Sequence, residues 1–149
     1  MLERPRRVLI VGGYGEVGRH RAVDLEVAHR GCGVVAGRHP ERSSGFPARR
    51  IDVDDAGSID VALDGADVVV ACVRQREPHL LRAAVRRGLA YTSIAPPWME
   101  WPDLEPLRLR ARETSARIVL AAGIEPERVV FPAPIGPRRA FTEQVRGAA

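Results

Sequence analysis

The sequence predicts an α/β fold in which about six strands form one doubly wound parallel sheet. Two observations carry this prediction. Short runs of β-branched and apolar residues alternate with longer amphipathic segments over the first 122 residues, and a glycine-rich turn joins the first run to the first amphipathic segment. Apolar runs without polar alternation are typical of strands that are buried on both faces, as in parallel sheets. The alternation is therefore that of successive βαβ units.

The strands are expected where runs rich in Val, Ile and Ala stop at glycine, proline or polar residues. The predicted strands are residues 8–11, 33–37, 49–51, 67–73, 91–94 and 117–121, and the predicted helices are residues 16–30, 59–63, 77–87 and 104–115. Gly31 and Gly88 are expected to cap helix C-termini, and Ser58 to cap a helix N-terminus. Residues 38–47 are predicted to be a polar connection.

The pattern of residues changes near residue 122, and we expect the domain boundary there. A chain of 149 residues is of single-domain size. Residues 1–122 carry the periodic pattern, whereas residues 123–149 hold several prolines and little periodicity. We therefore expect a single domain over residues 1–122, followed by an irregular Pro-rich C-terminal tail over residues 123–149.

The charged residues exclude several chemistries. The net charge is +4, and all 23 basic residues are arginine, because the sequence contains no lysine. A Walker A loop, a Schiff-base lysine and the Tyr/Lys pair of short-chain dehydrogenases all need lysine. The arginines are interleaved with acidic residues and lack aromatic neighbours, which favours solvated faces and predicts no nucleic-acid partner.

The apolar segments indicate where the protein is located, and the cysteines indicate whether a metal site is expected. No apolar run approaches the roughly 20 residues that cross a bilayer, and no signal-peptide pattern opens the sequence, so we expect a cytoplasmic protein without a membrane partner. Cys32 and Cys72 stand far apart without a CxxC motif. They are predicted to be reduced, buried thiols, and no metal site is expected.

The glycine-rich turn is the strongest functional motif. Gly12 precedes a GxGxxG pattern formed by Gly13, Tyr14, Gly15, Glu16, Val17 and Gly18. The pattern stands between a predicted strand and a predicted helix, which is the context of a dinucleotide-binding Rossmann fold. The first glycine permits a tight turn, the second lets the backbone approach a pyrophosphate, and the third lets helix and strand pack closely. The alternative is a glycine turn that holds no ligand.

The end of the second predicted strand favours NADP over NAD. NAD-binding folds usually carry Asp or Glu there for the ribose 2′-hydroxyl, and this sequence has Gly37 and Arg38 instead. Arg38, supported by His39 and Arg42, offers planar donors to a 2′-phosphate. We therefore predict NADP as the cofactor, with NAD as the alternative. The competing interpretation is that Arg38 is a solvated loop arginine.

Further candidate cofactor contacts follow the third and fourth predicted strands. Asp52 is placed to meet the adenine edge, and a helix-capping role for the same aspartate cluster is equally plausible. Ala71, Cys72 and Val73 are expected to line the ribose and nicotinamide side, since ligands bind at the carboxyl ends of parallel strands. Cys72 is interpreted as a packing residue, because no base partner is evident for it. No catalytic residue is assigned.

Five segments in order resemble the saccharopine dehydrogenase-like oxidoreductases. The segments are residues 8–19 with the GGYGxVG turn, 35–38, 65–70, 83–91 with an AxxxGxxY pattern, and 122–126, which is similar to a GxxPG signature. The resemblance implies an NADP-binding Rossmann domain that takes part in hydride transfer with a small-molecule substrate. Members of that family continue into a second domain that carries the substrate site, so residues 123–149 are either a tail or the stump of such a domain.

Two function hypotheses from different classes follow. The first is the NADP-binding module of an oxidoreductase, completed by a second domain, a separate subunit or a second copy of the chain. The alternative is a non-catalytic NADP-sensing or protein-interaction module. Its support is the apolar loop with Trp98, Met99 and Trp101, whose side chains are available either to a partner or to the core of the domain itself.

Overall fold

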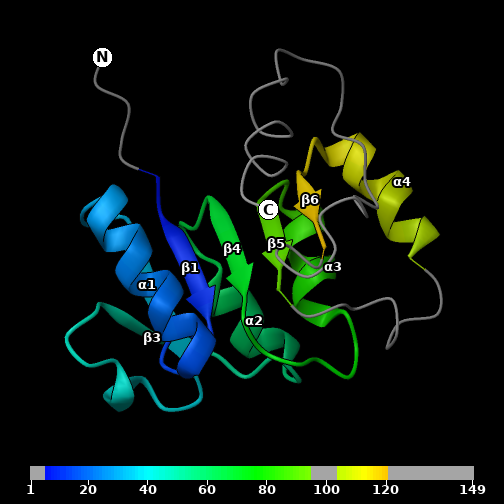
Figure 1. The fold of residues 1–149 in the computed structure, drawn as a ribbon. Helices are drawn as coiled ribbons and strands as arrows, with labels where there is room; N and C mark the ends of the chain where they lie inside the picture. Colours follow the sequence, from blue (N-terminus) through cyan, green and yellow to red (C-terminus); the bar gives the residue numbers. More distant parts are fainter. Residues whose placement is uncertain (1–5, 95–103, 121–149) are drawn as a thin grey trace.

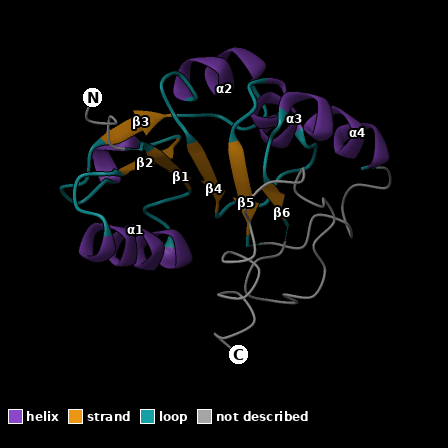
Figure 2. Ribbon diagram, turned by 90° about the horizontal axis from the view of Figure 1, so that it is seen from above, coloured by secondary structure: helices purple, strands orange, loops and turns teal. Residues whose placement is uncertain are grey.

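The computed structural model describes residues 6–94 and 104–120 as one parallel sheet with helices on both faces (Figures 1 and 2). The strands are β1 (Val8–Val11), β2 (Gly33–Gly37), β3 (Ala48–Arg50), β4 (Val68–Ala71), β5 (Ala90–Ser93) and β6 (Ile118–Val119). The helices are α1 (Glu16–Ala28), α2 (Ala56–Ala62), α3 (His79–Arg86) and α4 (Glu105–Thr114), with a short 3₁₀ helix, η1 (Pro40–Arg42). The predicted α/β fold and the predicted order of elements are confirmed.

The strand order is β3-β2-β1-β4-β5-β6, and all neighbouring strands are parallel. The chain moves outward from β1 through β2 to β3 and then crosses back to β4, beside β1. This reversal makes the sheet doubly wound. Ligands of such sheets bind outside the carboxyl ends of the strands at this reversal, which here are the ends of β1 and β4.

Alternate residues of the strands face two separate cores. Leu9, Val11 and Val69 belong to the larger cluster, which α2, α3 and α4 cover, while Ile10 and Val35 pack with Ala22 of α1. Figure 2 shows α1 on one side of the sheet and the other three helices on the opposite side. Burial on both faces explains why the strands read as continuous apolar runs.

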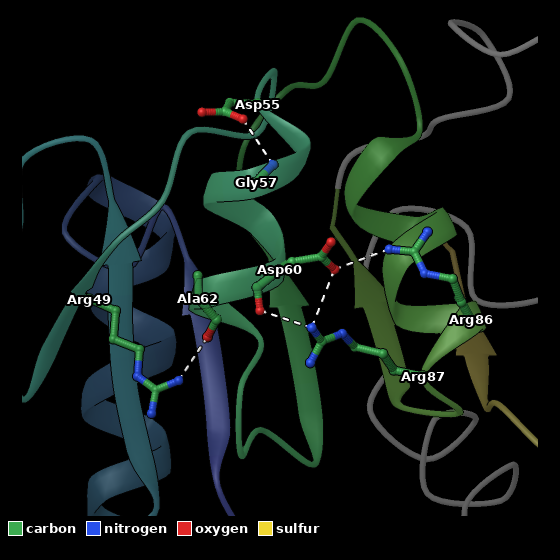
Figure 3. A network of polar contacts seen from close by, with 7 residues as sticks. All are labelled: Arg49, Asp55, Gly57, Asp60, Ala62, Arg86 and Arg87. Atoms are coloured by element: carbon green, nitrogen blue, oxygen red, sulfur yellow. Dashed lines mark hydrogen bonds and ion pairs between the residues drawn. The ribbon is translucent and has the colours of Figure 1, made fainter.

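Polar contacts with three arginines tie α2 and the residues after it to neighbouring elements (Figure 3). The carboxylate of Asp60 lies 3.0 Å from a guanidinium nitrogen of Arg86 and 3.3 Å from one of Arg87. The guanidinium of Arg49, on β3, donates to the carbonyl oxygens of Ala62 at 2.8 Å and Asp64 at 2.5 Å. These carbonyls lie at the C-terminal end of α2 and directly after it. The Arg49 side chain, on strand β3, therefore caps this end of the helix.

Several predicted boundaries are wrong. β4 ends at Ala71 instead of continuing to residue 73, because its partner β1 ends opposite it at Val11. α2 begins three residues earlier than predicted, because its N-cap is Asp55, whose side chain accepts a hydrogen bond from the Gly57 amide at 2.9 Å. Ser58 is therefore not the cap, and its hydroxyl accepts from the Asp52 amide at 2.8 Å.

Other differences are smaller. The C-cap of α1 is His29 instead of Gly31, which lies two residues later with a φ of +76°. Both cysteines are free and half-buried instead of fully buried. In the part of the chain that the structure describes, none of the helices is long and apolar enough to cross a membrane. The apolar loop with Trp98 and the predicted tail of residues 123–149 lie outside the described residues, so the domain boundary near residue 122 stays a prediction.

Candidate functional site

The glycine-rich turn links the end of β1 to the start of α1. Gly12 has a φ of +79°, the left-handed conformation that glycine adopts without strain. Its amide donates to the Ala36 carbonyl at 2.7 Å, and its carbonyl accepts from the Gly15 amide at 3.0 Å. The tight-turn role predicted for Gly13 as first glycine of the pattern therefore belongs to Gly12.

Close packing accounts for two further glycines. A Cβ at Gly13 would lie 2.7 Å from the Cβ of Val35 on β2, and a Cβ at Gly18 would overlap the Gly12 carbonyl oxygen. Gly18 thus allows α1 to approach the turn, which is the role that the pattern predicts for the third glycine. Any side chain at either position would push α1 or the turn away from the sheet.

Gly15 gives the turn its open side. It is exposed, and an added Cβ would meet only the Gly12 carbonyl oxygen, at 3.3 Å. It is also the N-cap of α1, whose first turn, with the exposed residues Glu16 and Val17, receives no side-chain cap. Uncapped amides at a helix N-terminus together with the helix dipole favour a negatively charged ligand. The turn thus has the shape and the electrostatics of an anion cradle.

Tyr14 connects this turn to the end of β2. Its hydroxyl accepts a hydrogen bond from the His39 backbone amide at 2.7 Å. Its ring lies over Gly37, where a Cβ would lie 2.5 Å from Cζ of the ring and closer still to the hydroxyl oxygen. The structure therefore brings the two predicted parts of the site, the glycine turn and the end of β2, into direct contact.

The three basic residues predicted to read a 2′-phosphate have different surroundings. Arg38 is exposed directly after β2, and Arg42 is exposed in η1. The imidazole of His39 lies with Nδ1 3.2 Å from the Glu41 carboxylate. Of the three, Arg38 is the one whose position at a strand end matches the predicted role.

Asp52 stands at the same edge of the sheet, after β3. Its carboxylate accepts from the Asp54 amide at 3.1 Å, and the carboxylate that caps α2 is that of Asp55. The capping role considered for the aspartate cluster thus falls to Asp55. Asp52 is half-buried, and contact with an adenine edge stays a prediction for it.

The end of β4 lies beside the turn. An added Cβ at Gly12 would lie 2.5 Å from Val73 Cγ1 and 3.1 Å from the Cys72 carbonyl oxygen, so the segment after β4 borders the turn. That Ala71, Cys72 and Val73 line the ribose and nicotinamide side of a cofactor stays a prediction. Burial raises the pKa of the Cys72 thiol to about 11, against a smaller opposing effect of the Arg21 charge. At neutral pH Cys72 is a neutral thiol, which agrees with a packing role.

The loop after β4 contains polar residues that were not predicted as part of a site from the sequence. Arg74, Gln75 and Arg76 line a hollow of about 490 Å³ together with Asp54. Gln75 is buried, and its Nε2 donates to the Tyr91 hydroxyl at 3.0 Å. The signal was available, since two arginines and a glutamine directly follow the predicted central strand of residues 67–73. In residues 6–94 and 104–120 no group of three or more His, Cys, Asp or Glu side chains could hold a metal ion.

Comparison with solved structures identifies the fold. Saccharopine dehydrogenase (L-Glu forming) from Saccharomyces cerevisiae has a TM-score of 0.61 and 20% identity over 78% of this chain and 27% of its own. A Rossmann-fold NAD(P)-binding family protein from Shigella flexneri has a TM-score of 0.55 and 20% identity over 78% of this chain and 67% of its own. Triphenylmethane reductase from Citrobacter sp., solved with NADP(H), has a TM-score of 0.56 and 15% identity over 76% of this chain and 48% of its own.

These likenesses confirm the predicted Rossmann-type fold, and with it the structural side of the resemblance to saccharopine dehydrogenase. No protein-family model and no curated protein matches the chain. The chain spans about a quarter of the length of the yeast enzyme, since 27% of that enzyme is covered.

Proposed function

We propose that this chain is the NADP-binding domain of an oxidoreductase that resembles saccharopine dehydrogenase, with NAD as the alternative cofactor. The observation that carries the proposal is the glycine turn. Gly12 has the left-handed backbone, Gly18 admits α1 against it, and Gly15 leaves the uncapped start of α1 open. This arrangement fits the pyrophosphate of a dinucleotide, since backbone amides and the helix dipole both favour a doubly charged anion there.

The remaining parts of the dinucleotide are assigned from the order of the strands. In this proposal Arg38 binds a 2′-phosphate, with His39 and Arg42 in the same loop, and Asp52 meets the adenine edge. Ala71, Cys72 and Val73 line the side of the crevice toward the nicotinamide. When bound, the nicotinamide supplies the hydride, and the residues of this chain bind and orient it.

The substrate site is proposed to come from elsewhere. The solved relatives named above are longer than this chain, and a second domain, a separate subunit or a second copy would complete the site. A cytoplasmic location is part of the same proposal. The alternative of an NADP-sensing or interaction module rested on the apolar loop around Trp98, which lies outside the described residues, so no structural observation favours it.

Calorimetric titration with NADPH and NADH tests the proposal. We expect NADPH to bind more tightly, and Arg38→Met to weaken NADPH about tenfold to a hundredfold, because a hydrogen bond to a charged group contributes about 1.5–3 kcal/mol. The affinity for NADH should be unchanged. Arg30→Met removes an exposed arginine just beyond the C-terminal end of α1, away from the glycine turn, and is the matched control. Failure to bind either nucleotide would refute the proposal, and equal affinities would refute the role of Arg38.

Hydride transfer is tested separately. The chain is incubated with NADPH and a panel of imine, keto and enoyl acceptors, and the oxidation of NADPH is followed by its absorbance. Oxidation with one acceptor class would show that the chain is catalytic by itself. Binding without oxidation for every acceptor would restrict the proposal to a cofactor-binding domain.

A further inference from the structure

The contact between Tyr14 and Gly37 has a steric consequence for the end of β2. Tyr14 is half-buried and packs on the cluster of Ile10, Ala22 and Val35, so residues of the sheet and of α1 hold its ring in place. An added Cβ at Gly37 would lie 2.5 Å from Cζ of the ring. Real Cβ atoms do not approach so closely, so position 37 takes no side chain while Tyr14 keeps this place.

The hydrogen bond of the same side chain has a second consequence. The Tyr14 hydroxyl accepts from the His39 amide at 2.7 Å, one residue after Arg38. On the other side, the Gly37 carbonyl accepts from the Ile51 amide at 2.9 Å. The backbone that carries Arg38 is therefore fixed on both sides, although the Arg38 side chain itself is exposed.

The chemistry at this strand end depends on which side chain is allowed there. A carboxylate at the end of the second strand accepts hydrogen bonds from a ribose 2′-hydroxyl and repels a 2′-phosphate, whereas an arginine attracts the phosphate. Tyr14 excludes the carboxylate at position 37 by occupying its space, and it steadies the backbone of the arginine. Both effects favour the phosphorylated ribose.

We propose that Tyr14 is the residue that sets the choice between the two dinucleotides, as a positioning residue that acts through Gly37 and the backbone of Arg38 and His39. This inference rests on the proposed function, because it assumes that a dinucleotide binds at the turn. It assigns Tyr14 a role beyond membership of the glycine motif: its ring blocks an acidic residue, and its hydroxyl orders the phosphate-reading loop.

The test combines four variants with two measurements, the thermal midpoint and the dissociation constants of NADPH and NADH. Tyr14→Phe keeps the ring and removes the hydrogen bond, so we expect NADPH affinity to fall about fivefold while the thermal midpoint and NADH affinity hold. Gly37→Asp alone should lower the thermal midpoint strongly. Tyr14→Ala with Gly37→Asp should recover much of that loss and bind NADH more tightly than NADPH. Tyr14→Ala completes the cycle.

Ala48→Asp is the control for the added carboxylate, since Ala48 is exposed at the start of the neighbouring edge strand β3. It should leave the thermal midpoint and the NADPH to NADH ratio as in the parent chain. An unchanged ratio in Tyr14→Phe, or a rise of NADPH affinity, would overturn the proposal. Equal destabilisation by Gly37→Asp in the presence and absence of the Tyr14 ring would overturn it as well, and this readout needs no nucleotide. Failure of the parent chain to bind either nucleotide would instead refute the proposed function.

Discussion

Gln75 and Tyr91 form a buried hydrogen bond that joins the loop after β4 to strand β5. Gln75 Nε2 lies 3.0 Å from the Tyr91 hydroxyl, which also contacts the side chain of Ser93. Among the described residues, no group hydrogen bonds to Gln75 Oε1. Burial raises the pKa of Tyr91 to about 12, although the hydrogen bonds from Gln75 and Ser93 oppose the rise. Tyr91 is therefore a neutral phenol that fixes the loop lining the hollow.

The free energy of unfolding should fall as the pH rises from about 10 to about 12. The pKa of Tyr91 is 10.0 before folding and about 12 in the folded chain, so the unfolded chain releases its proton first. The contribution of the neutral phenol is complete below pH 10 and is lost as the pH passes 12. Two pKa units correspond to up to about 3 kcal/mol. Urea denaturation at stepped pH measures this fall, and Cys72 should contribute in the same direction from pH 9 to 11.

A single-tyrosine background makes the same prediction visible by spectroscopy. Tyr14 and Tyr91 are the two tyrosines of the chain, so in Tyr14→Phe the phenolate absorbance reports Tyr91 alone. We expect this absorbance to rise near pH 12 in the folded chain and near pH 10 in denaturant. A transition near pH 10 under native conditions would contradict the burial argument.

Tyr91→Phe should destabilise the fold by about 1–3 kcal/mol, because it leaves the buried carboxamide of Gln75 without its partner. Adding Gln75→Leu removes the stranded polar group as well. The double variant should therefore lose less stability than the two single variants together, and chemical denaturation of all three measures the difference. Strict additivity would show that the two side chains do not act as a pair.

Gly18→Ala and Gly15→Ala should separate packing from ligand binding. An added Cβ at Gly18 overlaps the Gly12 carbonyl, so we expect a loss of about 1–3 kcal/mol of stability. At Gly15 the Cβ meets the same oxygen at 3.3 Å, a tight contact that a small shift relieves, so stability should fall less than in Gly18→Ala. The affinity for NADPH should fall more than about tenfold, since the methyl keeps the pyrophosphate from the backbone. Thermal unfolding and calorimetric titration give the two readouts. Unchanged binding by the folded Gly15→Ala variant would argue against a phosphate at the turn.

Arg49→Met should cost about 1–2 kcal/mol of stability, although its aliphatic part keeps the packing of β3. The guanidinium donates to the carbonyl oxygens of Ala62 and Asp64, which have few other partners at the end of a helix. Arg50→Met is the matched control, because the neighbouring arginine is exposed on the same strand. Equal unfolding midpoints for the two variants would show that Arg49 does not act as a cap.

Patterns that are local in the sequence were predicted well. The run from Val8 to Val11, the glycine turn and the helix that follows are each determined by neighbouring residues, and the alternation of strands and helices indicates a parallel sheet. Local rules fail where two adjacent residues can fill one role. Gly12 and Gly13 both tolerate a left-handed backbone, and the contact of Gly13 with Val35, 22 positions away in the chain, leaves the turn to Gly12.

Contacts between distant segments could not be predicted from the sequence, for a physical reason. The partners of Tyr14, Gln75 and Arg49 lie 25, 16 and 13 positions away, and no periodicity or propensity connects such pairs. They become visible only once β2, β3 and β5 are placed in the sheet. The part of the site that depends on the turn was therefore predictable, and the part that depends on loops meeting across strand ends was not.

The hydrogen bonds of the glycine turn also bear on the entropy of binding. The Gly12 amide donates a hydrogen bond to the Ala36 carbonyl, and the Gly15 amide donates one to the Gly12 carbonyl, so the fold itself orders the turn. A ligand that docks there need not restrict the backbone again, because that conformational freedom was already lost on folding. Its affinity should then reflect the contacts it makes. Its association should proceed as docking to a rigid surface, without a slow loop-closing step.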